Sequence, residues 1–323
     1  MGKTYECIYF YPQHEAYTLF VISMLLMWTK KVLDLDGLDF KYMYENLDSP
    51  LILEKFYCIL NYMNICQTHG FSRGDLVFEK KILNRNIDWS NDKRNLTKKL
   101  FAHKGFIEDL RDASIGHMIY SKKNIGGDIM RKDCTRQEAY FLTCPTLLIS
   151  RLFLSNLTDR EALIVQNAYT FNSYQGHGEI FRYSALKQEK YQTNVLLCID
   201  TLDIGKSDKK YEKSVINREL NKIVSALNGS FTPEVIAADA HLFGSDVGSI
   251  DLRVAIQILA VLSCGKKFYS CTNQNGQLYE RVEKLGRSIT SKSPTVQKFY
   301  IELIRLAHSR KENFSLNELA ESL

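Results

Sequence analysis

The pattern of apolar and polar residues divides the chain into a helical first part and a mixed second part. Between residues 12 and 66 apolar residues recur at helical spacing, as at Ile52 and Phe56, which favours amphipathic helices. The stretch 17–28 is apolar almost throughout, but it is shorter than the roughly 20 residues that a membrane-spanning helix needs. We therefore expect a buried helix there and no membrane partner.

From about residue 76 to residue 110 the chain is polar and basic, and the run N-D-K-R-N-L-T-K-K-L-F-A-H-K covers 91–104. A solvated helix face or loop explains such a run best, and a polyanion-binding patch is the alternative. Because no stacking platform or nucleic-acid motif accompanies the run, we do not expect nucleic acid as a partner.

After residue 115 short β-rich runs alternate with longer helical stretches. This alternation is typical of a mainly parallel sheet with helices on both faces, which binds ligands beyond the carboxyl ends of its strands. No linker rich in Pro, Gly or Ser divides the chain. The expected strands cover 117–121, 162–166, 194–200, 233–237 and 266–270, and the expected helices cover 136–154, 212–227, 248–263, 276–288 and 294–309.

Composition narrows the class of protein. A chain of 323 residues with 45% hydrophobic residues and a net charge of +5 is typical of a soluble globular protein. The eight cysteines show neither a C-x-x-C pair nor neighbouring histidines, so we expect buried reduced thiols, no metal site and no cofactor. The first residues lack a small-residue cleavage site. We therefore expect an intracellular protein, nuclear or cytoplasmic.

The segment with the most chemical information runs from Ile125 to Phe153. It contains a glycine turn, a short loop, and Gln137-Glu138 at the start of an apolar helix. A glycine turn that enters a helix offers free backbone N–H groups, which suit a phosphate. The segment resembles the signature of the poly(ADP-ribose) glycohydrolases, which reads G-G-G, six to eight residues, then Q-E-E, and a helix ending S-R-L-F.

Further segments extend the resemblance over about residues 52–309, in order along the chain. It implies an α/β fold, namely a macrodomain-like three-layer sandwich with a mainly parallel central sheet and an N-terminal helical accessory region. We assign 1–110 to the helical region and 111–323 to the macrodomain, packed as one unit. The segments are F-Y-C-I-L-N-Y at 56–62, Y-T-F-N-S-Y-Q-G-H-G-E-I-F-R-Y at 169–183, R-E-L-N-K at 218–222, L-R-V-A-I-Q-I-L-A at 252–260 and T-V-Q-K-F-Y-I-E-L-I-R at 295–305.

The resemblance also implies damaged catalytic chemistry. In this family the second glutamate of Q-E-E acts as acid and base at the bond between two riboses, a step that needs a carboxyl group. Ala139 stands at that position, and its methyl group neither donates nor accepts a proton. A second family acid is matched by Ile119. We expect no catalytic residue, with Glu138 as the only remaining candidate.

The ligand cleft that the resemblance implies is degenerate as well. Asp128 replaces the third glycine, where a carboxylate would repel a phosphate, and His177 and Cys271 replace family aromatics. The second glycine loop, at 239–249, keeps only two glycines. The residues that the resemblance places at this cleft are Gly126, Gly127, Asp128, Gln137, Glu138, Tyr174, Gly176, His177, Gly244 and Gly248.

Three functions remain open. The leading hypothesis is a catalytically inactive glycohydrolase-like protein that serves as a protein–protein interaction scaffold, so that its partner is another protein. The second is a reader that binds ADP-ribose or poly(ADP-ribose) without hydrolysis. The third is a weak residual glycohydrolase that uses Glu138.

Overall fold

The computed structural model describes residues 6–25, 37–186, 193–202, 207–239, 241 and 248–323.

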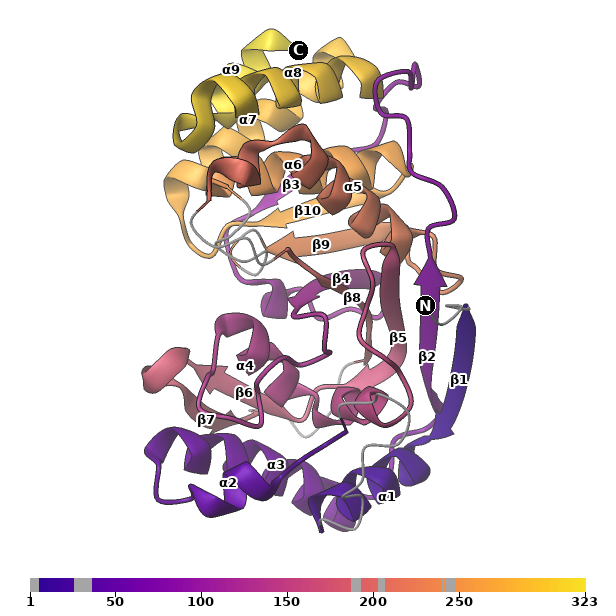
Figure 1. The fold of residues 1–323 in the computed structure, drawn as a ribbon, viewed down its shortest axis with the longest axis vertical. Coiled ribbons are helices and arrows are strands. Elements are labelled where there is room, and N and C mark those ends of the chain that lie inside the picture. The colour runs from indigo at the N-terminus through magenta and orange to yellow at the C-terminus, as the bar shows by residue number, and fades with distance from the viewer. Residues whose placement is uncertain (1–5, 26–36, 187–192, 203–206, 240, 242–247) are drawn as a thin grey trace.

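A twisted eight-stranded sheet forms the centre of the molecule (Figure 1). Its strands are β1 (Cys7–Pro12), β2 (Asp75–Ile82), β3 (Leu100–His103), β4 (Ile115–Ser121), β5 (Glu161–Tyr169), β8 (Thr193–Asp200), β9 (Val235–Asp239) and β10 (Lys267–Cys271). Their order is β1-β2-β5-β8-β4-β9-β10-β3. The strands from β8 to β3 pair in parallel, whereas β1·β2, β2·β5 and β5·β8 are antiparallel. The expected α/β fold with a mostly parallel central sheet is confirmed.

Helices cover both faces of this sheet. They are α1 (Gln13–Met24), α2 (Lys41–Glu45), α3 (Pro50–His69), α4 (Arg136–Thr143), α5 (Lys213–Leu227), α6 (Ile250–Ser263), α7 (Gly276–Lys292), α8 (Val296–Arg310) and α9 (Leu316–Ser322), with the 3-10 helices η1 (Ile107–Asp109), η2 (Pro145–Leu152), η3 (Gly178–Ile180), η4 (Asp208–Tyr211) and η5 (Lys311–Asn313). In Figure 1 the helices α7, α8 and α9 lie above the sheet, and α1, α2 and α3 lie below it. A small hairpin of β6 (Asn172–Gln175) and β7 (Arg182–Ala185) lies between α3 and α4.

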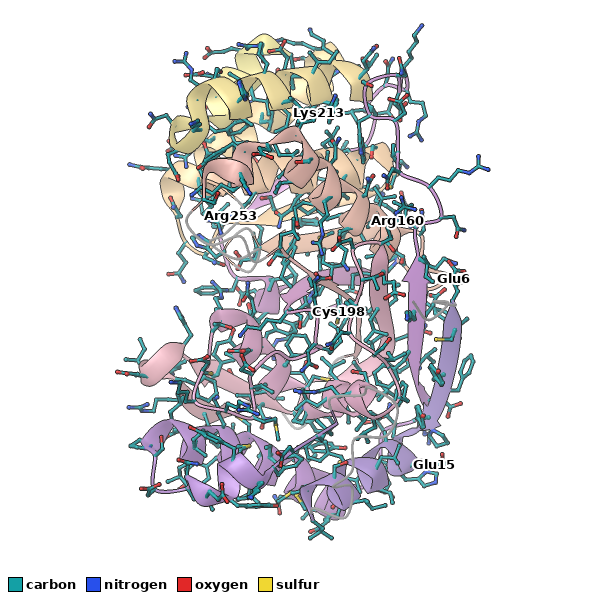
Figure 2. All side chains as sticks on the ribbon, in the orientation of Figure 1. Glu6, Glu15, Arg160, Cys198, Lys213 and Arg253 are labelled. Atoms are coloured by element: carbon teal, nitrogen blue, oxygen red, sulfur yellow. The ribbon has the colours of Figure 1, made fainter. Side chains whose placement is uncertain are left out.

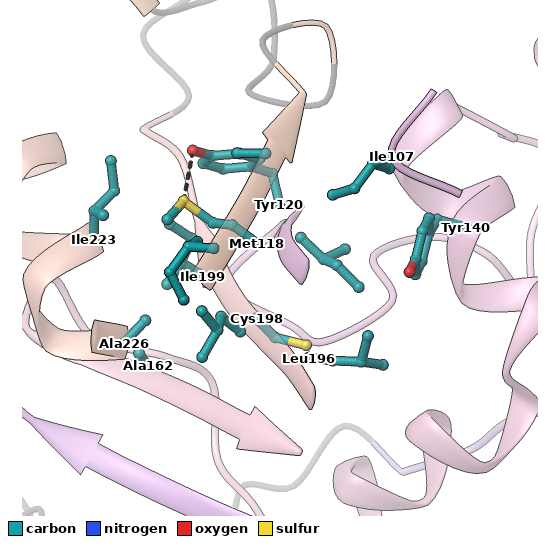
Figure 3. Packing of buried hydrophobic residues seen from close by; sticks show 14 of the residues in the cluster. Ile107, Met118, Tyr120, Tyr140, Ala162, Leu196, Cys198, Ile199, Ile223 and Ala226 are labelled. Carbon is teal, nitrogen blue, oxygen red and sulfur yellow. Dashed lines mark hydrogen bonds between the residues drawn. The ribbon is translucent and has the colours of Figure 1, made fainter. Parts of the chain in front are cut away.

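The central strands β4 and β8 are buried on both faces. Tyr120 of β4 points toward α5 and α6, and its hydroxyl accepts a hydrogen bond from Gln257 Nε2 at 2.9 Å and donates one to Met118 Sδ at 3.1 Å (Figure 3). On the opposite face Cys198 of β8 points toward Tyr140 of α4 (Figure 3). This cysteine is fully buried and is labelled near the middle of the view in Figure 2. Such strands read as continuous apolar runs, which is why the sequence predicted them.

Three strands fall where the sequence predicted helix, solvated helix face or loop. β1 precedes the first helix, and β2 and β3 lie in the polar and basic part of the chain. In β2 the Lys80 ammonium is buried and lies 2.9 Å from Glu161 Oε1 of β5. A buried ion pair hides a strand from a pattern analysis, because that analysis treats every lysine as exposed.

The helix expected over 136–154 is broken. α4 ends at Thr143, and η2 begins at Pro145. Proline lacks the backbone N–H that an α-helix needs, so the chain continues in the tighter 3-10 form.

All eight cysteines are free thiols, and six of them are buried. Among the helices of the described residues, none is sufficiently long and apolar to cross a membrane.

Candidate functional site

The glycine turn lies directly beyond the carboxyl end of β4. Gly126 and Gly127 have φ angles of 80° and 57°. A Cβ on Gly127 would lie 2.7 Å from Glu138 Oε1, and a Cβ on Gly126 would lie 2.5 Å from Leu148 Cδ2. Both glycines are therefore needed for the close packing of the turn against α4 and η2.

Glu138 holds this turn and the start of α4 together. Its Oε1 accepts a hydrogen bond from the Asp128 N–H at 2.8 Å, and its Oε2 accepts from the N–H (2.8 Å) and the hydroxyl (3.0 Å) of Thr135. The Glu138 N–H in turn donates to Thr135 Oγ1 at 3.2 Å, which completes a capping box at the helix start. The side chain of Glu138 is buried, and both of its carboxyl oxygens accept hydrogen bonds from the protein.

Asp128 supplies the turn with a second carboxylate. It forms an ion pair with Lys122, and this hydrogen-bonded partner lowers the pKa of the Asp128 carboxyl group. The Asp128 N–H, which would otherwise face the crevice, is already donated to Glu138. At this turn the Asp128 carboxylate is therefore paired with Lys122, and the Asp128 N–H already has a hydrogen-bond acceptor.

The hollow beside the glycine turn is almost closed. It has a volume of about 10 Å³, which is room for about one water molecule. Gly126, Gly127, Gln137 and Glu138 line it, so the structure brings these four predicted residues together.

A separate and larger cavity lies between η1, α4 and β6. Its volume is about 520 Å³, within the range of roughly 300–1,000 Å³ that is usual for small-molecule sites. Tyr174, Gly176 and His177 line it, and none of the residues around the small hollow does. The predicted site residues thus divide between two spaces.

Arg136, at the start of α4, lines the large cavity. Its Nη2 lies 2.9 Å from Asp239 Oδ2 at the end of β9 and 3.6 Å from Glu108 Oε2 of η1. Glu108 Oε1 accepts a hydrogen bond from the Tyr174 hydroxyl at 2.7 Å. The guanidinium also lies over the Phe106 ring, 5.0 Å from its centroid.

In this cluster the carboxyl groups of Asp239 and Glu108 face the single guanidinium of Arg136. This leaves an excess of negative charge in a region shielded from water. Loss of water on burial raises the pKa of the Asp239 carboxyl group to about 6, although Arg136 acts in the opposite direction. The cluster therefore does not favour a phosphate at this end of the cavity.

His117 and Tyr140 form a buried pair in the cavity wall. His117 Nε2 lies 2.7 Å from Leu110 O, and a carbonyl can only accept, so this nitrogen carries the proton. Nδ1 then accepts from the Tyr140 hydroxyl at 2.9 Å. Burial lowers the pKa of His117 to about 4, so the imidazole is neutral at pH 7.

Comparison with known proteins identifies the family. The family model described as Poly (ADP-ribose) glycohydrolase (PARG), Macro domain fold, matches residues 86–280. The chain belongs to this family.

Curated relatives carry the same family name. Poly(ADP-ribose) glycohydrolase 1 of Caenorhabditis elegans is 23% identical over 233 residues, which cover 65% of this chain and 30% of the relative. Poly(ADP-ribose) glycohydrolase 1 of Arabidopsis thaliana is 28% identical over 178 residues, which cover 52% of this chain and 32% of the relative. The chain thus matches about a third of the length of these relatives.

Residues around the family signature differ in accessibility. Ala139, which the resemblance aligns with the catalytic glutamate, is fully buried and lines neither of the two spaces. Gly248 is buried before α6, and a Cβ there would lie 2.6 Å from Leu252 Cδ2. Gly244 lies outside the described residues.

Sequence reasoning missed Arg136 and Glu108, which line the large cavity, and Asp239, which is buried and forms an ion pair with Arg136. Asp239 could have been found, because it is an acidic residue at the carboxyl end of an apolar strand. Arg136 directly precedes the Q-E pair but is not part of the family signature. Glu108 lies in a polar stretch and gives no signal.

Within the described residues, no group of three or more His, Cys, Asp or Glu side chains could hold a metal ion.

Proposed function

We propose that this chain is a member of the poly(ADP-ribose) glycohydrolase family that does not cleave poly(ADP-ribose) and serves as a protein–protein interaction scaffold. The observation that carries the proposal is that the carboxyl group of Glu138, the one glutamate left in the Q-E-E motif, is hydrogen-bonded within the protein. Both of its oxygens accept hydrogen bonds from the glycine turn and from the start of α4.

Cleavage of a glycosidic bond needs a carboxyl group that delivers a proton to the leaving oxygen. Glu138 would have to break its hydrogen bonds to Asp128 and Thr135 to reach a substrate, and a hollow of about 10 Å³ leaves no room for one. Ala139 is buried and carries no proton. These observations support inactivity and argue against a residual glycohydrolase that uses Glu138.

The scaffold role is supported by apolar side chains that remain exposed on a rigid fold. Phe10 and Ile8 of the edge strand β1 are 58% and 43% exposed, and Ile180 of η3 is 69% exposed. Ile8 and Phe10 alternate along β1 and therefore project from the same face of the strand, and contiguous exposed apolar groups are typical of surfaces that meet other proteins.

A reader of ADP-ribose is the second candidate, and the large cavity favours it. Besides its volume of about 520 Å³, the cavity is lined by Glu108, whose Oε2 lies 3.6 Å from Arg136 Nη2 and accepts no hydrogen bond within the described part of the chain. Such an oxygen would accept a donor from a ligand.

The decisive experiment combines a hydrolysis assay with a calorimetric titration of the purified protein. We expect no release of ADP-ribose from poly(ADP-ribose) under conditions in which an active family member digests it, and no binding heat with ADP-ribose up to millimolar concentration. The Glu138→Gln variant is the matched control, since contaminating hydrolase activity would survive in it unchanged.

Release of ADP-ribose that depends on Glu138 would refute inactivity. Micromolar binding without release would replace the scaffold by the reader. In that case Asp128→Gly, which removes the charge at the glycine turn, shows whether the ligand's phosphates lie at the turn or only in the large cavity.

A further inference from the structure

A fully buried lysine of the N-terminal helices binds the loop that joins the glycine turn to α4. Lys55 of α3 is 0% exposed. Its Nζ donates to Ile129 O at 3.1 Å, to Arg131 O at 2.6 Å and to Asp133 O. All three carbonyls belong to one short stretch of the loop.

The chemistry of this contact is complete. An ammonium group has three N–H donors, and three carbonyl oxygens meet it here. Desolvation lowers the pKa of Lys55, and the carboxyl groups of Glu138 and Asp133 act in the opposite direction. No ion pair with Lys55 occurs among the residues that the structure describes, so backbone dipoles are its direct partners.

The loop is thereby held between two buried charges of opposite sign. Glu138 accepts from the loop's donors at its two ends, Asp128 and Thr135, while Lys55 donates to carbonyls between those ends. The carbonyls of alternate residues turn inward to one point, and the side chains of Arg131, Lys132 and Asp133 are exposed.

The same helix also shapes the wall of the large cavity. Asn61 of α3 donates to Phe171 O at 3.0 Å and to Asn172 Oδ1 at 2.9 Å, and Asn172 Nδ2 donates to Cys58 O at 2.9 Å. Asn172 lines the cavity. Residues of α3 therefore bind two segments that border the site, the loop before α4 and the start of β6.

We propose that Lys55 is a positioning residue, whose ammonium group fixes the loop at residues 128–135 against α4 and thereby keeps the hollow beside the glycine turn closed. The N-terminal helices are on this account part of the site. This inference does not require the proposed function, because it concerns the shape of the loop whether or not a ligand binds.

Cys134 reports on the loop directly. Its thiol is buried, and its backbone carbonyl accepts from the Gly178 N–H at 2.5 Å. In Lys55→Ala we expect a thiol reagent, read out by peptide mass spectrometry, to label Cys134 roughly tenfold faster or more, since the loop opens locally. Cys198 in the central strand β8 should stay protected. Lys132→Ala, which removes an exposed lysine of the same loop, should leave both rates unchanged.

A rescue experiment separates the charge from mere packing. Propylammonium matches the atoms that Lys55→Ala removes, and 1-propanol has the same length without the charge. We expect millimolar propylammonium to restore protection of Cys134 and 1-propanol to have no effect.

Equal rescue by both compounds, or Cys198 labelled in parallel with Cys134, would overturn the proposal. If Lys55→Ala does not fold, Lys55→Gln keeps part of the chain and two N–H donors. Its Cys134 should react at an intermediate rate, and a rate equal to that of the unchanged protein would also overturn the proposal.

Discussion

The buried ionisable side chains at this site have different kinds of hydrogen-bond partner. Glu138 accepts three hydrogen bonds at its two oxygens, and Lys55 donates to three carbonyls. His117 has one carbonyl and one hydroxyl as partners, and the neutral imidazole satisfies both by donating to the carbonyl and accepting from the hydroxyl. Loss of water on burial lowers the pKa of His117, although its hydrogen bond to the Leu110 carbonyl acts in the opposite direction.

The neutral state of His117 predicts a dependence of stability on pH. An unfolded histidine titrates near pH 6.5 and the folded one near pH 4, so the unfolded state binds more protons between these values. The contribution of His117 is therefore fully present above about pH 6.5 and is lost as the pH falls to about 4. The loss amounts to about 3 kcal/mol.

The measurement compares the protein with His117→Gln, whose amide can donate to Leu110 O and accept from Tyr140. The raised pKa of Asp239 acts in the opposite direction at acidic pH, but it is common to both proteins and cancels. From urea denaturation, we expect the free energy of unfolding of the unchanged protein to fall by about 3 kcal/mol relative to that of the variant between pH 7 and pH 4. A difference that stays constant with pH would show that folding does not lower the pKa of His117.

At the scale of elements, the start of α4 depends on its capping box. In Glu138→Gln the amide nitrogen must face either the Asp128 N–H or the donors of Thr135, so that two donors oppose each other. We expect a loss of about 1–3 kcal/mol in the free energy of unfolding. Glu179→Gln, at an exposed glutamate of η3, should change it by less than about 0.5 kcal/mol. Equal stability of the two variants would mean that Glu138 does not cap the helix.

The helix α5 shows why the fold could be predicted from the sequence more readily than the site. Its R-E-L-N-K letters match the family, and each polar letter has a structural partner. Arg218 Nη1 donates to Asp200 O at 2.7 Å, Lys222 forms a buried ion pair with Asp200, and Asn221 Oδ1 accepts from Trp89 Nε1 at 3.2 Å. Such letters identify the scaffold and say nothing about a ligand.

The large cavity could not be predicted in the same way. Its lining combines Glu108 of a 3-10 helix, Arg136 of an α-helix and Tyr174 of the small hairpin, and the buried Asp239 of β9 forms an ion pair with Arg136. These residues are far apart along the chain, so their proximity follows from the topology of the sheet. The local pattern around each of them fits an ordinary exposed or core position.

At the scale of the whole molecule, the N-terminal part of the chain contacts the central sheet and the segments around the site. β1 pairs with β2 before α1 begins, and β2 pairs with β5 in the middle of the chain. Lys55 and Asn61 of α3 bind the loop before α4 and the strand β6. The division into 1–110 and 111–323, packed as one unit, stays a prediction, and these contacts favour a single folding unit.

This arrangement predicts that both parts unfold in one transition. Trp89 is buried beside Tyr300, with ring centroids 6.4 Å apart, and reports on the end of the molecule that carries α8. Cys58 and Cys66 are buried in α3 and report on the other end. In a Trp28→Phe variant, which leaves Trp89 as the one tryptophan, we expect the fluorescence change and the onset of cysteine labelling to have the same midpoint in urea.

Labelling of the two α3 cysteines well below the midpoint of the Trp89 signal would mean that the helices are a separate domain. In that case the loop before α4 would lose Lys55 while the sheet remains folded. Because Lys55→Ala removes the same contact without removing the helices, its Cys134 labelling should then equal that of the unchanged protein at this intermediate urea concentration. Coincident midpoints, together with fast Cys134 labelling only in Lys55→Ala, would instead show that the helical region is a structural part of the site around the glycine turn.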